Sequence, residues 1–141
     1  MAAVWSKRKK ILVLIAALIV VPMVIFLPGI IWEFHQANQA LHTFASTLEA
    51  KQFQQAYELT TKEFRSSSDY TAFLKGHENL TARFGDLQRI EINNSEVKER
   101  SDAWYGYYDV NLAFSHGASI PFSFVLKKQD GSWKIYSYRE L

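Results

Sequence analysis

The stretch Trp104–Phe114, WYGYYDVNLAF, alternates with a period of two between apolar positions and mixed polar and aromatic positions. One set of alternate positions holds Trp104, Tyr108, Val110, Leu112 and Phe114, and the other holds Tyr105, Tyr107, Asp109 and Asn111. Successive side chains of a strand point to opposite faces of its sheet. The pattern therefore predicts a β-strand with the first set in a hydrophobic core and the second set on an outward face.

The chain on both sides of this stretch continues the strand pattern. Ile120, Phe122, Phe124 and Leu126 alternate in the next segment, and turn residues occupy 115–118 and 129–132. The last segment, Trp133–Tyr138, places Trp133 and Ile135 inward and Lys134, Tyr136 and Tyr138 outward. With an earlier strand around Leu87–Val97, the sequence predicts four strands joined by hairpins into an antiparallel sheet.

Helical periodicity precedes the strands. Apolar residues recur every three or four positions from Glu33 to Leu48, from about 52 to 64, and from Tyr70 to about Gly85. The run Ser66–Asp69 supplies side chains that cap a helix before the third segment. Helices grouped before an antiparallel sheet predict an α+β domain with the helices packed on one face of the sheet.

This arrangement resembles a known superfamily. Three helices and four strands, with FQQAYELT at 53–60, Phe64-Arg65, and DGSWKI at 130–135, look like the nuclear-transport-factor-2-like (cystatin-like, cone-shaped) superfamily over roughly residues 36–141. The resemblance implies a curved four-stranded sheet. The superfamily includes enzymes resembling ketosteroid isomerase and scytalone dehydratase, and non-catalytic modules such as the single-span periplasmic component of type IV secretion machines. The fold alone therefore does not assign a function.

An uncharged run precedes the domain. Its 22 residues, Ile11–Trp32, follow directly on a cluster of four basic residues, Lys7, Arg8, Lys9 and Lys10. A helix of this length reaches roughly 33 Å, enough to cross a membrane core of about 30 Å. The basic cluster favours a cytoplasmic N-terminus. We expect a cytoplasmic tail at 1–10, a transmembrane helix at 11–32, and a periplasmic or extracellular domain at 33–141, in an inner or plasma membrane.

Residues in and around the span are typical of a membrane anchor. Trp5 and Trp32 flank the span as interfacial aromatic residues do, and Pro22 with the Pro28-Gly29 pair predicts a kink. A cleaved secretory signal is the alternative, since it also has a basic start and an apolar middle. Signal peptides usually have an apolar region of about 7–15 residues followed by a small-residue cleavage site.

The charge and cysteine content exclude several classes of partner and site. Outside the basic cluster, residues 33–141 carry 12 Lys and Arg against 14 Asp and Glu, so no basic surface for nucleic acid is expected. The sequence has no cysteine, which rules out disulfides and thiolate metal sites. Metal-ligand spacings, nucleophile motifs and phosphate loops are also missing from the sequence. We expect no metal and no cofactor.

The candidate acid–base residues are three histidines. His77 shares a helical stripe with Phe73 and Leu80, which predicts a partly buried, hydrogen-bonded histidine. His116 falls in a turn, and His42 lies beside the apolar stripe of its helix. We therefore assign no catalytic residue.

Aromatic residues on the outward face of the sheet suggest binding. The predicted partner-binding residues are Tyr105, Tyr107, Tyr136, Tyr138, Pro121 and Val125. Tyrosine is enriched at interfaces, although it also stabilises exposed sheet faces. The sequence favours a non-catalytic accessory or assembly subunit of a membrane complex, whose partners are the bilayer and either other subunits or a second copy. The alternative is a pocket-bearing enzyme or small-ligand-binding protein of the same fold.

Overall fold

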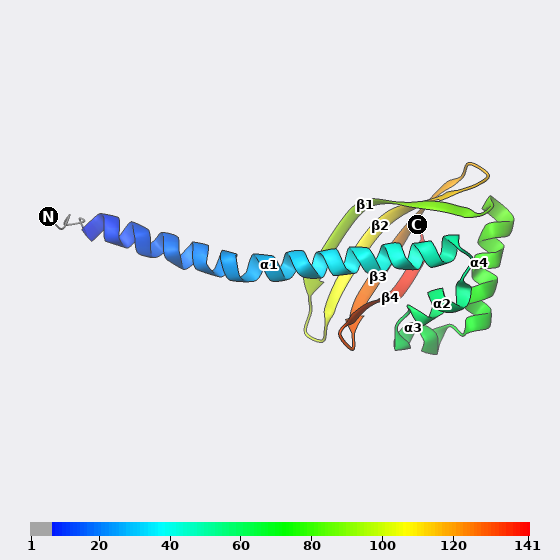
Figure 1. Ribbon diagram of the computed structural model, residues 1–141, viewed down its shortest axis with the longest axis horizontal. Helices are drawn as coiled ribbons and strands as arrows, with labels where there is room; N and C mark the ends of the chain where they lie inside the picture. Colours follow the sequence, from blue (N-terminus) through cyan, green and yellow to red (C-terminus); the bar gives the residue numbers. More distant parts are fainter. Residues whose placement is uncertain (1–6) are drawn as a thin grey trace. The chain divides into compact units, whose positions relative to one another are not determined.

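A computed structural model describes residues 7–141, and the contacts within the chain divide it into two compact units, Met1–Glu33 and Phe34–Leu141. Helices come first and strands follow (Figure 1). The elements are α1 (Lys7–Glu49), α2 (Phe53–Glu58), α3 (Lys62–Ser67), α4 (Tyr70–Phe84), β1 (Leu87–Glu99), β2 (Trp104–Phe114), β3 (Ser119–Gln129) and β4 (Ser132–Glu140). The α+β class predicted from the sequence is confirmed.

The described part of the first unit is the N-terminal part of α1, which is mostly apolar. The helix continues through Pro22 and Pro28, and its apolar side chains up to Trp32 are exposed. Among residues 7–141, α1 is the one helix that is long and apolar enough to cross a membrane. A signal sequence near an N-terminus has the same length and apolar composition, so the helix fits either an anchor or a signal sequence. Trp5 lies outside the described residues, and only the backbone of Lys7 and Arg8 is described.

The second helical segment predicted from the sequence, 52–64, is two short helices in the structure. The chain leaves the helix at Leu59 because this stretch pairs with the edge of the sheet. The backbone N–H of Thr61 donates to the carbonyl of Ile135 at 2.9 Å, and the N–H of Ile135 donates to the carbonyl of Leu59 at 3.0 Å. These bonds satisfy backbone groups at the edge of β4. The stabilisation they give outweighs that of the helical hydrogen bonds that a continued helix would form.

Side-chain and backbone caps delimit α4. The Asp69 carboxylate accepts a hydrogen bond from the Ala72 N–H at 2.8 Å, as expected for an N-cap from the Ser66–Asp69 run. Gly85 ends the helix at φ +86°, and a Cβ there would collide with Ser115 Oγ. Glycine is needed at this position for both conformation and space.

The four strands form one antiparallel sheet in the order β1-β2-β3-β4. The pairing of β3 with β4 shifts near its middle: Leu126 pairs with Ile135, but Val125 pairs with Ser137. Tyr136 is therefore an extra residue in β4, and the side chains after it change face. This bulge decides which tyrosines point outward.

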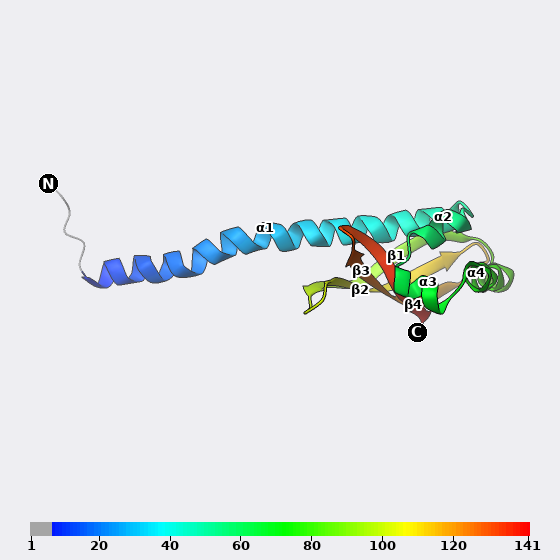
Figure 2. The ribbon, with the colours of Figure 1, turned by 90° about the horizontal axis from the view of Figure 1, so that it is seen from below.

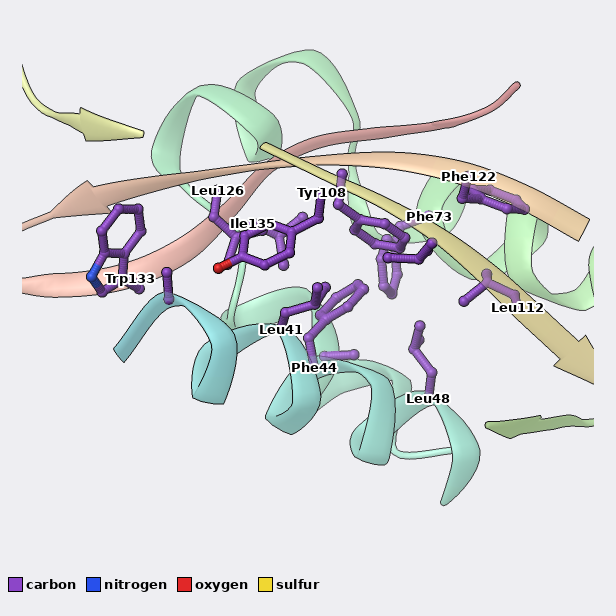
Figure 3. Packing of buried hydrophobic residues seen from close by; sticks show 14 of the residues in the cluster. Leu41, Phe44, Leu48, Phe73, Tyr108, Leu112, Phe122, Leu126, Trp133 and Ile135 are labelled. Atoms are coloured by element: carbon purple, nitrogen blue, oxygen red, sulfur yellow. The ribbon is translucent and has the colours of Figure 1, made fainter. Parts of the chain in front are cut away.

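The core of the Phe34–Leu141 unit lies between the sheet and the last third of α1, which crosses one face of the sheet (Figures 1 and 2). Leu41, Phe44 and Leu48 of α1 point toward Tyr108, Leu126 and Ile135 of the sheet (Figure 3). Trp133 is also buried in this layer, at 8% exposed. Of the inward set predicted for β2 and β3, seven residues are buried: Tyr108, Val110, Leu112, Phe114, Phe122, Phe124 and Leu126. The other two, Trp104 and Ile120, are half-buried and pack against this core.

Candidate functional site

The core contains a small apolar cavity on the helical side of the sheet. It is bounded by the end of α1, by α2 and α4, and by all four strands. Its lining includes Leu48, Phe53, His77, Leu112, Phe122 and Tyr138. The cavity volume is about 30 Å³, room for one or two water molecules. Pockets that hold small molecules are about 300–1,000 Å³, so this cavity is far below that size.

His77 is the polar centre of the cavity wall. Its Nε2 atom lies 2.7 Å from the Tyr138 Oη, which joins α4 to β4 by a hydrogen bond. The imidazole lies between two aromatic rings, with centroids 5.9 Å from Phe53 and 4.6 Å from Phe73. Burial lowers the pKa of His77 to about 4 and raises the pKa of Tyr138 well above its ordinary value. Both groups are therefore uncharged at neutral pH.

This pair can orient a polar group, and the lowered pKa makes the neutral imidazole of His77 a weak base. A catalytic base is usually tuned to a pKa near the working pH, whereas His77 is shifted away from it. No carboxylate is hydrogen-bonded to His77 among residues 7–141, and no cluster of metal-ligating side chains occurs there. His77 is half-buried and hydrogen-bonded, as predicted, and the predicted outward position of Asp109 is also confirmed.

The rim of the cavity carries charge. Lys51 Nζ lies 2.9 Å from Asp86 Oδ1, and Glu49 and Thr81 line the same rim. Both partners of the ion pair are more than half exposed, so the pair contributes little to stability. The two other candidate histidines, His42 and His116, are exposed and do not line the cavity.

The helix-free side of the sheet carries the second candidate site, which we call the outer face. It is defined by Tyr105, Tyr107, Pro121, Val125 and Tyr136. The Tyr105 ring lies 6.4 Å from that of Tyr107 and 6.0 Å from that of Tyr136, measured between centroids. The three tyrosines therefore form a continuous aromatic cluster over β2 and β4, with Pro121 exposed and Val125 half-buried beside them.

Tyr138 is not part of the outer face, and its predicted outward placement is wrong. Simple alternation from Tyr136 puts Tyr138 outward, but the bulge at Tyr136 turns the later part of β4 over. The Tyr138 ring instead stacks on Phe124, at 5.2 Å between centroids, and on Phe64 at 5.7 Å. It belongs to the core and the cavity.

At one end of the outer face, Lys127 contacts acidic residues and two of the tyrosine rings. Its Nζ lies 2.7 Å from Glu63 Oε1 of α3 and 3.6 Å from Asp102 Oδ2, and 5.7 Å from each of the ring centroids of Tyr105 and Tyr136. The hydrogen bond from Lys127, with further bonds from backbone and Gln129, lowers the pKa of Glu63 to about 2. No sequence pattern marks this network, because Glu63 and Lys127 lie 64 positions apart.

A hollow of about 410 Å³ lies next to the aromatic cluster. Its lining is Tyr107, Ser123, Val125, Ser137, Tyr138 and Arg139. Lys98 Nζ lies 4.9 Å from the centroid of the Tyr107 ring. The outer face thus combines an aromatic surface, a depression and flanking charges.

A scan of protein-family models finds no match to the chain, and a sequence search of curated proteins finds none either. Solved structures of similar fold include a protein described as an NTF2-like transpeptidase from Campylobacter jejuni, with a TM-score of 0.53 and 15% identity over 71% of this chain and 96% of that chain. A protein from Catenulispora acidiphila has a TM-score of 0.56 and 15% identity over 77% and 89% of the two chains. Aln2 from a Streptomyces species has a TM-score of 0.55 and 14% identity over 77% of this chain and 88% of that chain.

At this level of identity the similarity establishes the fold. The chain contains an NTF2-like fold, and the resemblance noted in the sequence is confirmed at that level. Proteins with this fold serve many functions, so the function has to be argued from the two sites.

Proposed function

We propose that this chain is a non-catalytic accessory or assembly subunit of a larger membrane protein complex. In this proposal the apolar part of α1 anchors it in an inner or plasma membrane, and the C-terminal domain lies in the periplasm or outside the cell. The basic cluster Lys7–Lys10 supports this orientation, because positive charge next to a span is retained in the cytoplasm. The outer face is the docking surface.

The observation that carries this proposal is the contrast between the two sites. The outer face presents the rings of Tyr105, Tyr107 and Tyr136 beside a hollow of about 410 Å³, whereas the inner cavity measures about 30 Å³. Tyrosines bury a large area at a low entropic cost and keep a hydroxyl group for hydrogen bonding, so clusters of them favour protein contacts. Stabilisation of the exposed sheet alone requires cross-strand pairs but no adjacent hollow.

A pocket-bearing enzyme or small-ligand-binding protein is the second candidate. The hydrogen-bonded pair of His77 and Tyr138 in an apolar wall favours it, because polar groups of this kind orient a ligand in an apolar pocket. Such a ligand requires the cavity to open by an outward movement of α2 or α4. The small volume of the closed cavity weighs against this candidate.

Purification of the full chain in a mild detergent separates the two candidates. Native mass spectrometry of the purified material should show one or more further protein copies in fixed stoichiometry with the chain. A monomeric chain that carries a tightly bound small molecule, released on denaturation, would instead support the second candidate and contradict the first.

A further inference from the structure

A row of polar side chains crosses the helix-free side of the sheet. The register of the strands brings together four residues, one from each strand: Asn94, Asp109, Ser123 and Arg139. Neighbouring strands are about 4.8 Å apart, so the row is about 14 Å long. Ser123 is half-buried and the other three are exposed. None of the four side chains forms a hydrogen bond or an ion pair within residues 7–141, so all four are available to a ligand.

The row borders the hollow of about 410 Å³ on the outer face. Ser123 and Arg139 belong to the row and also line the hollow, together with Tyr107 and Ser137. The volume of the hollow falls within the range of about 300–1,000 Å³ that is usual for small-molecule sites, whereas the inner cavity measures about 30 Å³. Of these two spaces, the hollow is the one large enough to hold a ligand.

We infer that the hollow and the row bind an uncharged saccharide chain outside the cytoplasm. This inference goes beyond the proposed docking function and rests only on the proposed location of the domain. Each hydroxyl group of a sugar both donates and accepts hydrogen bonds, so its binding surface has to offer donors and acceptors at close spacing. The row offers both kinds of group, because the Asp109 carboxylate accepts, the Arg139 guanidinium donates, and the Ser123 hydroxyl does both.

The ring of Tyr107 supplies the apolar part of this site. Sugar rings present C–H groups between their hydroxyls, and such groups pack favourably on the negative face of an aromatic ring. Lys98 Nζ and Arg100 Cζ lie 4.9 Å and 5.5 Å from the centroid of the Tyr107 ring, and the Tyr105 ring stacks at 6.4 Å. These neighbours hold the ring in place, which lowers the entropic cost of binding a ligand on it.

The charges of the site favour an uncharged ligand. Among the residues that line the hollow or form the row, Arg139 is the one cation and Asp109 is the one anion. An anionic ligand that reaches along the row meets the Asp109 carboxylate, and a cationic ligand meets the Arg139 guanidinium, so either is repelled at one end. A polyhydroxylated ligand without charge forms hydrogen bonds with both.

The site leaves room for a protein on the same side of the sheet. Tyr105 precedes Asp109 by four residues in β2, which corresponds to about 14 Å along the strand. The rings of Tyr105 and Tyr136 pack together at that end, next to Lys127. A partner docked there leaves the polar row open, so one chain can hold a membrane complex against a saccharide.

Calorimetric titration of the purified full chain tests the inference. The chain is solubilised in a polyoxyethylene detergent, because a sugar-based detergent would compete for the site. The probes are cellotetraose and chitotetraose, the uncharged tetramers of glucose and N-acetylglucosamine, and sodium phosphate is the charged comparison. We expect saturable binding of at least one tetramer and no binding of phosphate at the same concentration. Binding of phosphate and of neither tetramer would show an anion site and overturn the inference.

Substitutions test whether the tetramer binds at the row. Asp109→Ala and Arg139→Ala should each weaken its binding about tenfold or more, because each removes a charged hydrogen-bonding group. Both residues are exposed, so the unfolding temperature should not change. Glu140→Ala, which removes the next charge along β4 and faces the other side of the sheet, is the matched control and should bind as the parent does.

Two further variants test the aromatic part of the site. Tyr107→Ala should also weaken tetramer binding about tenfold or more, because it removes the stacking surface. Tyr107→Phe keeps the ring and should retain most of the binding that Tyr107→Ala loses. Equal losses in the two variants, with both still folded in thermal unfolding, would contradict stacking of a sugar on the ring.

The outcomes separate this inference from the docking function, since tetramer binding is read from heat and docking from the mass of the complex. If neither tetramer binds, or if the Asp109 and Arg139 variants bind as tightly as the parent, the saccharide inference is wrong. Loss of the complex after replacement of the tyrosines would still support docking in that case. If a tetramer binds as described but the complex survives replacement of the tyrosines, the saccharide inference stands and the docking function is wrong.

Discussion

The Oη of Tyr138 lies 2.7 Å from the Nε2 of His77, although the two residues are 61 positions apart in the sequence. This hydrogen bond joins the last strand to α4 across the apolar cavity. Both rings are packed among other aromatic side chains, His77 against Phe73 and Tyr138 against Phe124. The pair is a structural contact of the core.

Removal of the Tyr138 hydroxyl group should lower stability. Tyr138→Phe leaves a nitrogen of His77 without its partner, which costs about 1–3 kcal/mol in the free energy of unfolding. Tyr136→Phe, on the outer face, is the matched control and should change it by less than about 0.5 kcal/mol. Urea unfolding of both variants measures the difference. Equal values for the two variants would show that the hydrogen bond contributes nothing.

The buried imidazole should make the domain sensitive to acid. The pKa of His77 is about 4 in the folded chain, below the usual value of 6.5 expected when it is unfolded. Between these values the unfolded chain binds a proton that the folded chain does not. The free energy of unfolding therefore falls as the pH decreases from about 6.5 to 4, by about 3 kcal/mol in total.

His77→Gln isolates this contribution, because glutamine can hydrogen-bond to Tyr138 and does not titrate. Unfolding curves of the parent and the variant, measured at intervals from pH 7 to pH 4, give the difference in stability at each pH. We expect the parent to lose its advantage over the variant as the pH falls. A difference that is constant with pH would contradict the shifted pKa.

The alternation of side chains predicted most of the sheet because one face of each strand is buried and the other is not. The inward positions of Tyr108, Phe124 and Trp133 followed from this pattern alone. Tyr138 was misplaced because a bulge adds one residue to β4 and reverses the alternation after it. Nothing in the sequence around Tyr136 marks a bulge, since the residues there suit either face.

Trp133 should be one of the residues on which the fold depends most. It is 8% exposed and closes the core against α1 (Figure 3). Trp133→Ala should cost about 3–5 kcal/mol, a large part of the roughly 5–15 kcal/mol typical of a domain. Limited proteolysis should cleave this variant faster than Lys134→Ala, its neighbour on the other face. Equal cleavage rates would contradict the burial of the indole ring.

The orientation in the membrane depends on the basic cluster at the N-terminus. A reporter that is active only outside the cytoplasm, fused after Leu141, should be active in the parent chain. Replacement of Lys7, Arg8, Lys9 and Lys10 by neutral residues should give a mixture of orientations and reduce this activity. Activity of only a cytoplasmic reporter at the same position in the parent would refute the proposed topology.

The sequence indicated part of the candidate site. Tyr105, Tyr107 and Tyr136 were placed correctly on one face, because their positions follow from the strand period. The Glu63–Lys127 ion pair was not predicted. It depends on how α3 packs at the sheet.

The mass of the complex that contains the full chain, measured in mild detergent, tests docking through the outer face. It is compared between the parent chain and a tyrosine variant. Replacement of Tyr105, Tyr107 and Tyr136 together by Ser should leave the domain folded, because surface changes typically cost about 0.5 kcal/mol each, but interface aromatics contribute about 2 kcal/mol or more each to binding. We predict loss of the complex with a cooperative unfolding transition retained, and no loss for the control substitutions His42→Ser and Glu49→Ser on α1. A complex of unchanged mass in the tyrosine variant would contradict the proposed docking surface.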